Sequence, residues 1–149
     1  MQSIRKLGPF ALSVSNLDRS VAFYKALGFE AGEKYPFPVS AAHAMGVTGA
    51  DAAMAMQKLT RDGAEVLLLE ISPAPAKKPA DGAAAQYGLA HLELLVSDLD
   101  GVAAEIQRMG GTILESTRSR LTDVGPNPLD MIFCRDPDGT LIALVDPHS

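Results

Sequence analysis

Val14-Ser15-Asn16-Leu17-Asp18 returns later in the chain as Val96-Ser97-Asp98-Leu99-Asp100, at an offset of 82 residues (14 to 96). The register continues without a gap and aligns residues 14–33 with residues 96–115. An ungapped recurrence of this length indicates that one supersecondary unit is used twice. The same register places Pro9 opposite His91, so at this position only the second copy has a side chain that can bind a metal or transfer a proton.

The composition limits the classes of partner. A chain of 149 residues with 47% hydrophobic content can bury roughly 70% of the surface that its unfolded form exposes. The net charge of −5, with no basic run longer than Lys77-Lys78, argues against nucleic acid and anionic membrane as partners. No apolar segment has the length of a signal peptide or a membrane span. Because a single cysteine, Cys134, fits a reducing compartment, we expect a cytoplasmic protein.

Each copy is expected to begin with a strand and a helix. Residues 89–96 form a short apolar run in which period two places His91, Glu93 and Leu95 on one face. Asp98 is a good helix N-cap, and apolar residues at helical spacing follow it as far as Gly110, which favours the left-handed conformation that ends a helix. The offset of 82 predicts a matching helix that ends at Gly28.

Three strands should follow each helix. The apolar runs predict strands over 29–34, 52–57 and 65–71 in the first copy and over 112–118, 131–135 and 141–146 in the second. Turns with Gly or Pro at 61–63 and 136–139 join the last two strands of each copy. We therefore predict a first βαβββ module over 1–72, a linker over 73–88 and a second module over 89–149. Two irregular stretches, 36–49 and 121–129, are either surface excursions or covers for a pocket mouth.

The motifs resemble a known superfamily. The opening Val14-Ser15-Asn16-Leu17-Asp18 segment and the closing Arg135-Asp136-Pro137-Asp138-Gly139 segment look like those of the vicinal oxygen chelate superfamily, which comprises the glyoxalase, bleomycin-resistance and extradiol dioxygenase proteins. The resemblance implies an α+β fold in which two βαβββ modules form a cupped, barrel-like mixed sheet with helices outside. It also implies a homodimer in which a module of one chain completes the cup of the other. Proteins with this fold catalyse many different reactions, so the resemblance does not identify the reaction of this chain.

In metal-using members the pattern implies four ligands, a His on the first strand and a Glu on the last strand of each module. Carried over by position, these places hold Pro9, Glu70, His91 and Ala143. Proline and alanine cannot bind a metal, and tight sites use three or four protein donors. We therefore expect either no cofactor or a weakly bound divalent metal such as Zn, Ni, Mn or Fe, held by His91 and Glu70.

A metalloenzyme that binds its metal through replacement ligands is an alternative. Glu93 shares the strand face of His91, and His43 lies in the irregular stretch 36–49. His91, His43 and either Glu70 or Glu93 could assemble the two-histidine, one-carboxylate set of nonheme iron enzymes. Phe133 stands where ring-cleaving relatives tend to carry a Tyr, which counts against dioxygenase chemistry.

The same residues can act without a metal. Glu70, His91 and Glu93 in an apolar cup would form a general acid/base set suited to proton abstraction next to a carbonyl. The structural alternatives are a hydrogen-bonded core histidine at His91 and a solvated Glu93. Glu70 follows an apolar run, and a carboxylate in that setting needs a partner.

Strand parity predicts the pocket lining around these groups. The expected lining is mostly apolar and consists of Pro9, Ala11, Ser13, Leu68, Met131, Phe133 and Ala143, with Leu141 and Val145 beside it. Met54 and Met56 are either pliable walls or plain core. Arg118, Arg120 and Arg135 could hold a substrate carboxylate or be solvated. We interpret Cys134 as a small buried hydrophobe rather than a nucleophile.

Three functions from different classes follow. The favoured one is an enzyme of the lyase, isomerase or epimerase type that acts on a small oxygenated substrate by acid/base chemistry. The second is a metal-dependent glyoxalase or ring-cleaving dioxygenase with replacement ligands. The third is a protein of the bleomycin-resistance kind, which binds a ligand and does no chemistry.

Overall fold

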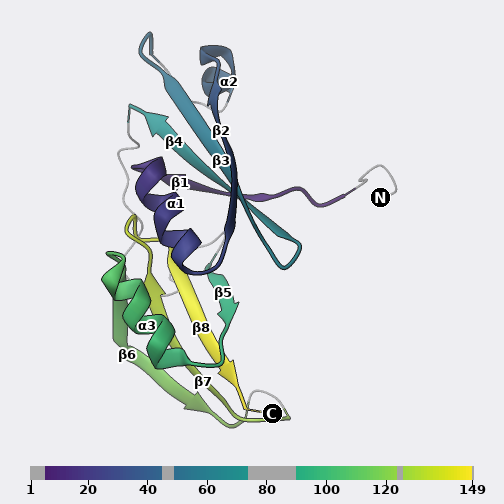
Figure 1. Cartoon of the computed structure of the whole chain (residues 1–149), viewed down its shortest axis with the longest axis vertical. Coiled ribbons are helices and arrows are strands. Elements are labelled where there is room, and N and C mark those ends of the chain that lie inside the picture. Colours follow the sequence, from purple (N-terminus) through teal and green to yellow (C-terminus); the bar gives the residue numbers. More distant parts are fainter. Residues whose placement is uncertain (1–5, 45–48, 74–89, 124–125, 149) are drawn as a thin grey trace. The chain divides into compact units, whose positions relative to one another are not determined.

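The computed structural model describes residues 6–44, 49–73, 90–123 and 126–148. The chain divides into two compact units, Met1–Ala76 and Lys77–Ser149, which we describe separately (Figure 1). The boundary falls inside the linker expected at 73–88, and of that linker only Pro73 is described.

The first unit holds one mixed sheet and two helices. Its elements are β1 (Phe10–Val14), α1 (Leu17–Ala26), β2 (Glu30–Phe37), α2 (Val39–Ala44), β3 (Ala53–Arg61) and β4 (Ala64–Ser72). The strand order is β1-β4-β3-β2, with β1 parallel to β4 and the other neighbours antiparallel.

The second unit repeats this plan without the short helix. Its elements are β5 (Leu92–Leu95), α3 (Leu99–Arg108), β6 (Thr112–Leu121), β7 (Leu129–Arg135) and β8 (Leu141–Pro147). The order β5-β8-β7-β6, again with one parallel and two antiparallel pairings, matches the first sheet strand for strand. The predicted tandem βαβββ fold is confirmed, and its two cupped sheets have four strands each and are not closed into a barrel.

The repeated motif sets the ends of both long helices. Asn16 and Asp98 precede α1 and α3, and their side chains accept hydrogen bonds from the backbone N–H of Arg19 and Gly101 at 2.8 and 2.9 Å. Such N-caps satisfy N–H groups that have no partner inside the helix. Gly28 and Gly110 take φ values of 86° and 87° just past the helix ends, the left-handed conformation predicted for them.

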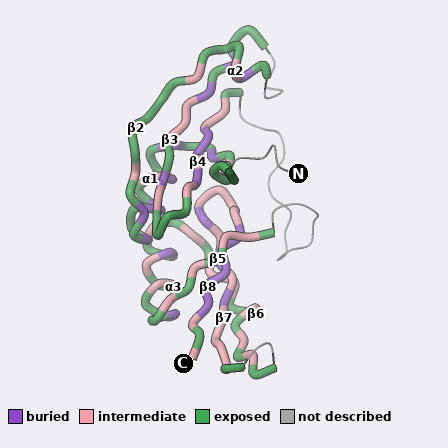
Figure 2. The backbone as a smooth tube through the Cα atoms, turned by 90° about the vertical axis from the view of Figure 1, so that its right-hand side faces the viewer, coloured by how far each residue is buried: buried purple, intermediate pink, exposed green. Residues whose placement is uncertain are grey.

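The helix-covered face of each sheet forms the core. In the second unit Ile132, Ile142 and Leu144 are fully buried on the strands that α3 contacts. Figure 2 shows the buried stretch of β8. In the first unit Leu59 and Leu68 are fully buried on the strands that α1 contacts. Each unit therefore buries one sheet face under its own helix.

The stretch 36–49 is more regular than the sequence indicated. Strand β2 continues to Phe37 and α2 occupies Val39–Ala44, while residues 45–48 are not described. Ala42 of α2 is fully buried in a cluster with Ala52 and Met54. Met54 is thus core rather than pocket wall, and packing stabilises a helix too short to be predicted from periodicity. No helix in the described part of the chain is long and apolar enough to cross a membrane.

Candidate functional site

Strand pairing in the second unit brings several predicted site residues to one sheet face. Glu93 of β5 lies beside Ala143 of β8, and Phe133 of β7 lies on the other side of Ala143. Met131 follows on the same face of β7, two residues from Phe133. We name these residues, together with His91, the His91 face.

His91 directly precedes β5 and packs on this face. Its ring meets the ring of Phe133 edge to face, with centroids 5.4 Å apart and an interplanar angle of 83°. Its Nε2 lies 4.0 Å from Oε2 of Glu93. Edge-to-face packing orients an aromatic ring without using its polar atoms. His91 is therefore positioned by Phe133 and faces a carboxylate.

The burial of His91 is uneven. The side chain is 30% exposed, yet its Nδ1 is buried and has no hydrogen-bond partner among the described residues. A core histidine that only stabilises the fold normally has its ring nitrogens hydrogen-bonded, because an unpaired buried polar atom costs about 1–3 kcal/mol. The interpretation of His91 as a satisfied core residue is therefore not supported.

The Nε2–Glu93 separation leaves room for a third group. At 4.0 Å the contact is an ion pair when the imidazole is protonated, and it is too long for a direct hydrogen bond. A water molecule or a substrate hydroxyl can bridge such a gap. Glu93 is 55% exposed, so this side of the imidazole faces solvent. The arrangement can move a proton to or from a small molecule seated on the His91 face.

The prediction that Glu70 and Leu68 lie on the sheet face that lines the pocket is wrong. Strand β1 pairs with β4 so that Ala11 lies beside Leu67 and Val14 beside Glu70. Neighbours in a parallel ladder point to the same face, and faces alternate along a strand. Glu70 and Leu68 therefore share the helix-covered face, whereas Ala11 and Ser13 point the other way.

The carboxylate of Glu70 is used inside the first unit. Its Oε2 accepts a hydrogen bond from the backbone N–H of Leu17, the first residue of α1. The expectation that this half-buried carboxylate needs a partner is confirmed, but the partner is a helix N-terminus. Pro9, on the N-terminal side of β1, is exposed, as are Ala11 and Ser13.

The residues at the implied ligand positions do not fit a four-donor metal site. Pro9 and Ala143 have no donor atom, and Glu70 is bonded to α1. His43 is exposed near the end of α2, with Nε2 3.2 Å from the carbonyl oxygen of Gly49. No group of three or more His, Cys, Asp or Glu side chains within the described ranges is arranged to hold a metal ion.

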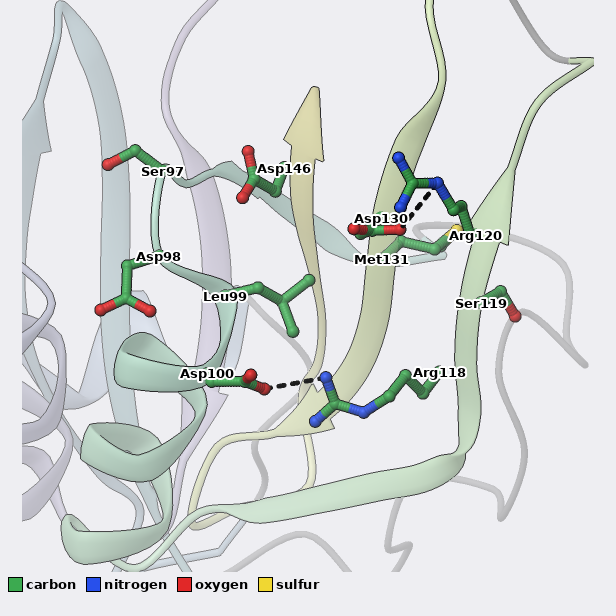
Figure 3. Close-up of a pocket in the computed structure, with 10 residues that line it drawn as sticks. All are labelled: Ser97, Asp98, Leu99, Asp100, Arg118, Ser119, Arg120, Asp130, Met131 and Asp146. Carbon is green, nitrogen blue, oxygen red and sulfur yellow. Dashed lines mark hydrogen bonds and ion pairs between the residues drawn. The ribbon is translucent and has the colours of Figure 1, made fainter. Parts of the chain in front are cut away.

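A separate cavity of about 470 Å³ opens at the start of α3 (Figure 3). It is lined by Ser97, Asp98, Leu99, Asp100, Arg118, Ser119, Arg120, Asp130, Met131 and Asp146. Arg118 donates to Asp100 at 2.9 Å and also bonds Glu115, while Nε of Arg120 lies 3.9 Å from Asp130. The aspartates outnumber the arginines, so this cavity does not favour the substrate carboxylate considered for the two arginines. Sequence reasoning missed the cavity because its walls come from separate elements that no local motif connects.

The remaining candidates are structural. Arg135 donates from Nη1 to the carbonyl oxygen of Gly139 at 2.7 Å and so closes the β7–β8 turn. Cys134 is fully buried, and burial raises the pKa of its thiol to about 12. The thiol is thus protonated at neutral pH, which agrees with its interpretation as a buried hydrophobe.

The family model of the Glyoxalase/Bleomycin resistance protein/Dioxygenase superfamily matches residues 6–144. The chain belongs to this superfamily. A search of curated proteins finds no match.

Solved structures show the same fold. A glyoxalase family protein from Bacillus cereus is 17% identical, with a TM-score of 0.75 and coverage of 100% of this chain and 99% of that one. A glyoxalase family protein from Enterococcus faecalis is 20% identical, with a TM-score of 0.63 and coverage of 95% and 97%. At these identities the likeness extends to the fold and not to the reaction.

Proposed function

We propose that the chain is a small-molecule enzyme of the lyase, isomerase or epimerase type that works without a metal on the His91 face. His91 transfers the proton through Nε2, and Glu93 stabilises the imidazolium that forms. The observation that carries this proposal is the environment of the His91 ring. The ring packs against Phe133, and its Nδ1 lacks a partner among the described residues. Its Nε2 faces Glu93.

The surroundings of His91 favour a substrate with an apolar part. Phe133, Met131 and Ala143 line the face, and Leu95 at the end of β5 is 70% exposed. An exposed apolar side chain next to a polar dyad is typical of sites that bind oxygenated organic molecules. Proton abstraction next to a carbonyl needs one base and a nearby polar group, and His91 with Glu93 supplies both.

Solvent-deuterium exchange tests the proposal without knowledge of the final product. The protein is incubated in D2O with a panel of small thioesters, hydroxyketones and 1,3-diketones, and loss of the α-proton signal is followed by NMR. We expect exchange with at least one class, a decrease of roughly 100-fold or more in His91→Gln, and a smaller decrease in Glu93→Gln. Arg120→Gln, outside the His91 face, is the matched control.

Two outcomes contradict the proposal. Exchange that disappears after EDTA treatment and returns with added Zn or Ni would establish a metalloenzyme. Absence of exchange throughout the panel, with a panel member still bound equally by wild type and His91→Gln, would establish a binding protein of the kind that sequesters its ligand.

We also propose a cytoplasmic homodimer. Strands β1 and β5 are edge strands of their sheets and carry exposed large apolar side chains, Phe10 at 50% and Leu95 at 70%. Exposed apolar edges favour pairing with another chain. Light scattering should give twice the chain mass for wild type and the chain mass for Phe10→Lys. A wild-type monomer at micromolar concentration would contradict the dimer.

A further inference from the structure

Because the two units are repeats, the second unit shows where the metal-ligand positions implied by the superfamily pattern should lie in the first unit. In the second unit Ala143, the position where the superfamily pattern implies a glutamate, lies beside Glu93. The offset of 82 makes Ala11 the counterpart of Glu93, and Ala11 lies beside Leu67. The first-unit counterpart of Ala143 is therefore Leu67 and not Glu70.

Glu70 is three residues further along β4. An odd number of residues places a side chain on the opposite face of a strand. There the Glu70 carboxylate meets the N-terminus of α1 and accepts the N–H of Leu17, while Asn16 accepts the N–H of Arg19. Two acceptors thus satisfy two of the unpaired N–H groups at this helix end, and the negative charge is favourable there.

The second unit carries an acid at the same place. Val96 donates to the carbonyl oxygen of Val145 at 2.8 Å, which continues the β5–β8 ladder and makes Asp146 the counterpart of Glu70. Asp146 lines the cavity at the start of α3 together with Leu99 (Figure 3). Its side chain is one methylene shorter, and the described residues show no hydrogen bond that it accepts from the N–H of Leu99.

We propose that Glu70 is a helix-capping residue that holds the end of β4 to the start of α1, and that it neither binds a metal nor transfers a proton. Position 67 is the first-unit ligand position, and it holds a leucine. His91 is then the one residue with a donor side chain at the four positions that the superfamily pattern implies. The hydrogen bond from the first N–H of α1 to the Glu70 carboxylate is explained by a capping role, whereas a ligand role would require the glutamate at position 67. This assignment stands independently of the reaction proposed for the His91 face.

Glu70→Gln and Glu70→Ala separate capping from ligation. Glutamine keeps an oxygen that can accept the Leu17 N–H, whereas alanine removes it. We expect the thermal midpoint to fall by roughly 3–6 °C in Glu70→Ala and by less than half of that in Glu70→Gln. The Leu17 amide should exchange with solvent about fivefold faster in the alanine variant, with a smaller change in the glutamine variant. Asp146→Ala is the matched control and should leave the Leu99 amide unchanged.

Calorimetric titration with Zn²⁺ and Ni²⁺ gives a second readout that does not depend on activity. We expect the affinity of the folded full chain for either ion to be the same in wild type, Glu70→Gln and Glu70→Ala. Loss of metal affinity by tenfold or more in both variants, or equal destabilisation by both with no change at the Leu17 amide, would overturn the assignment.

Discussion

The ring of His91 packs edge to face on the ring of Phe133 with their centroids 5.4 Å apart. His91 comes just before the edge strand β5 and Phe133 lies on β7, so this contact spans β8, on which Ala143 is the direct neighbour of Phe133. The contact therefore joins the edge of the sheet to its third strand.

A double-mutant cycle measures this contact. We expect His91→Gln and Phe133→Leu to show a coupling free energy of about 0.5–1 kcal/mol in urea unfolding, the lower part of the range for aromatic pairs because the imidazole is partly exposed. Met131→Leu with His91→Gln is the control pair and should be additive. A coupling indistinguishable from zero for His91 and Phe133 would mean that the rings do not stabilise one another.

The thiol of Cys134 should be inert in the folded protein. Because burial raises its pKa to about 12, with a smaller contribution from Asp136, only about one thiol in ten thousand is ionised near pH 8. We expect a thiol reagent such as DTNB to label the protein at the rate of unfolding. The same protein in guanidinium chloride should react within seconds, and equally fast labelling of the native chain would contradict the burial.

The two helix N-caps should differ in their effect on stability. Asp98→Ala removes the side-chain acceptor of Gly101, and we expect it to lower the free energy of unfolding by about 1–2 kcal/mol. Asn16→Ala should cost about 0.5–1 kcal/mol, because Glu70 still accepts the Leu17 N–H at that helix. Urea denaturation of both variants in parallel gives the comparison, and a larger loss in Asn16→Ala than in Asp98→Ala would contradict it.

Asp136 should be the most sensitive turn residue. It is 3% exposed, and its Oδ1 accepts the backbone N–H of Asp138 at 2.9 Å and of Thr140 at 2.8 Å. We expect Asp136→Ala to lower the free energy of unfolding by about 2–4 kcal/mol, since it removes the buried acceptor of two hydrogen bonds from partly buried N–H groups. Asp136→Asn keeps one oxygen acceptor and should cost less, so an equal loss in both variants would argue against this role.

The ion pairs of Arg118 should stabilise the chain in a way that depends on salt and pH. Its hydrogen bond to Glu115 lowers the pKa of that carboxyl, although both side chains are exposed. The stabilisation is therefore present above the usual glutamate pKa and disappears as the pH falls through the lowered value of the folded state. We expect Arg118→Met to lower the thermal midpoint near pH 7 and to have little effect near pH 2 or in about 1 M NaCl. An effect that is unchanged by salt would indicate lost packing.

Much of the fold could be predicted because its signals are local. Asn16 and Asp98 begin helices, and Gly28 and Gly110 end them, through hydrogen bonds and dihedral angles that involve neighbouring residues. The repeat of these signals at one offset gave two βαβββ units. The helix α2 was missed because six residues carry little periodicity, and the burial of Ala42 against Met54 that stabilises it is a tertiary contact.

The candidate site was predicted in part. Glu93, Met131, Phe133 and Ala143 lie on one sheet face as expected. Alternation of polar and apolar residues indicates the face of Glu93 on β5, whereas the superfamily motif indicated the face of Ala143 on β8. Strand β4 offers no such alternation. Leu68 and Leu69 are both buried, so its apolar run is compatible with either face being covered.

The sequence by itself determined the duplicated unit, its helix boundaries and the absence of donor atoms at Pro9 and Ala143, because these depend on residue identity and on local backbone chemistry. The tertiary structure alone decided that the Glu70 carboxylate faces the start of α1 and that Leu67, not Glu70, lies beside Ala11. That choice depends on the register between β1 and β4, which is set by long-range pairing. A shift of one residue in that register would place the Glu70 side chain on the other face of the sheet. There the carboxylate could act as a ligand instead of capping α1.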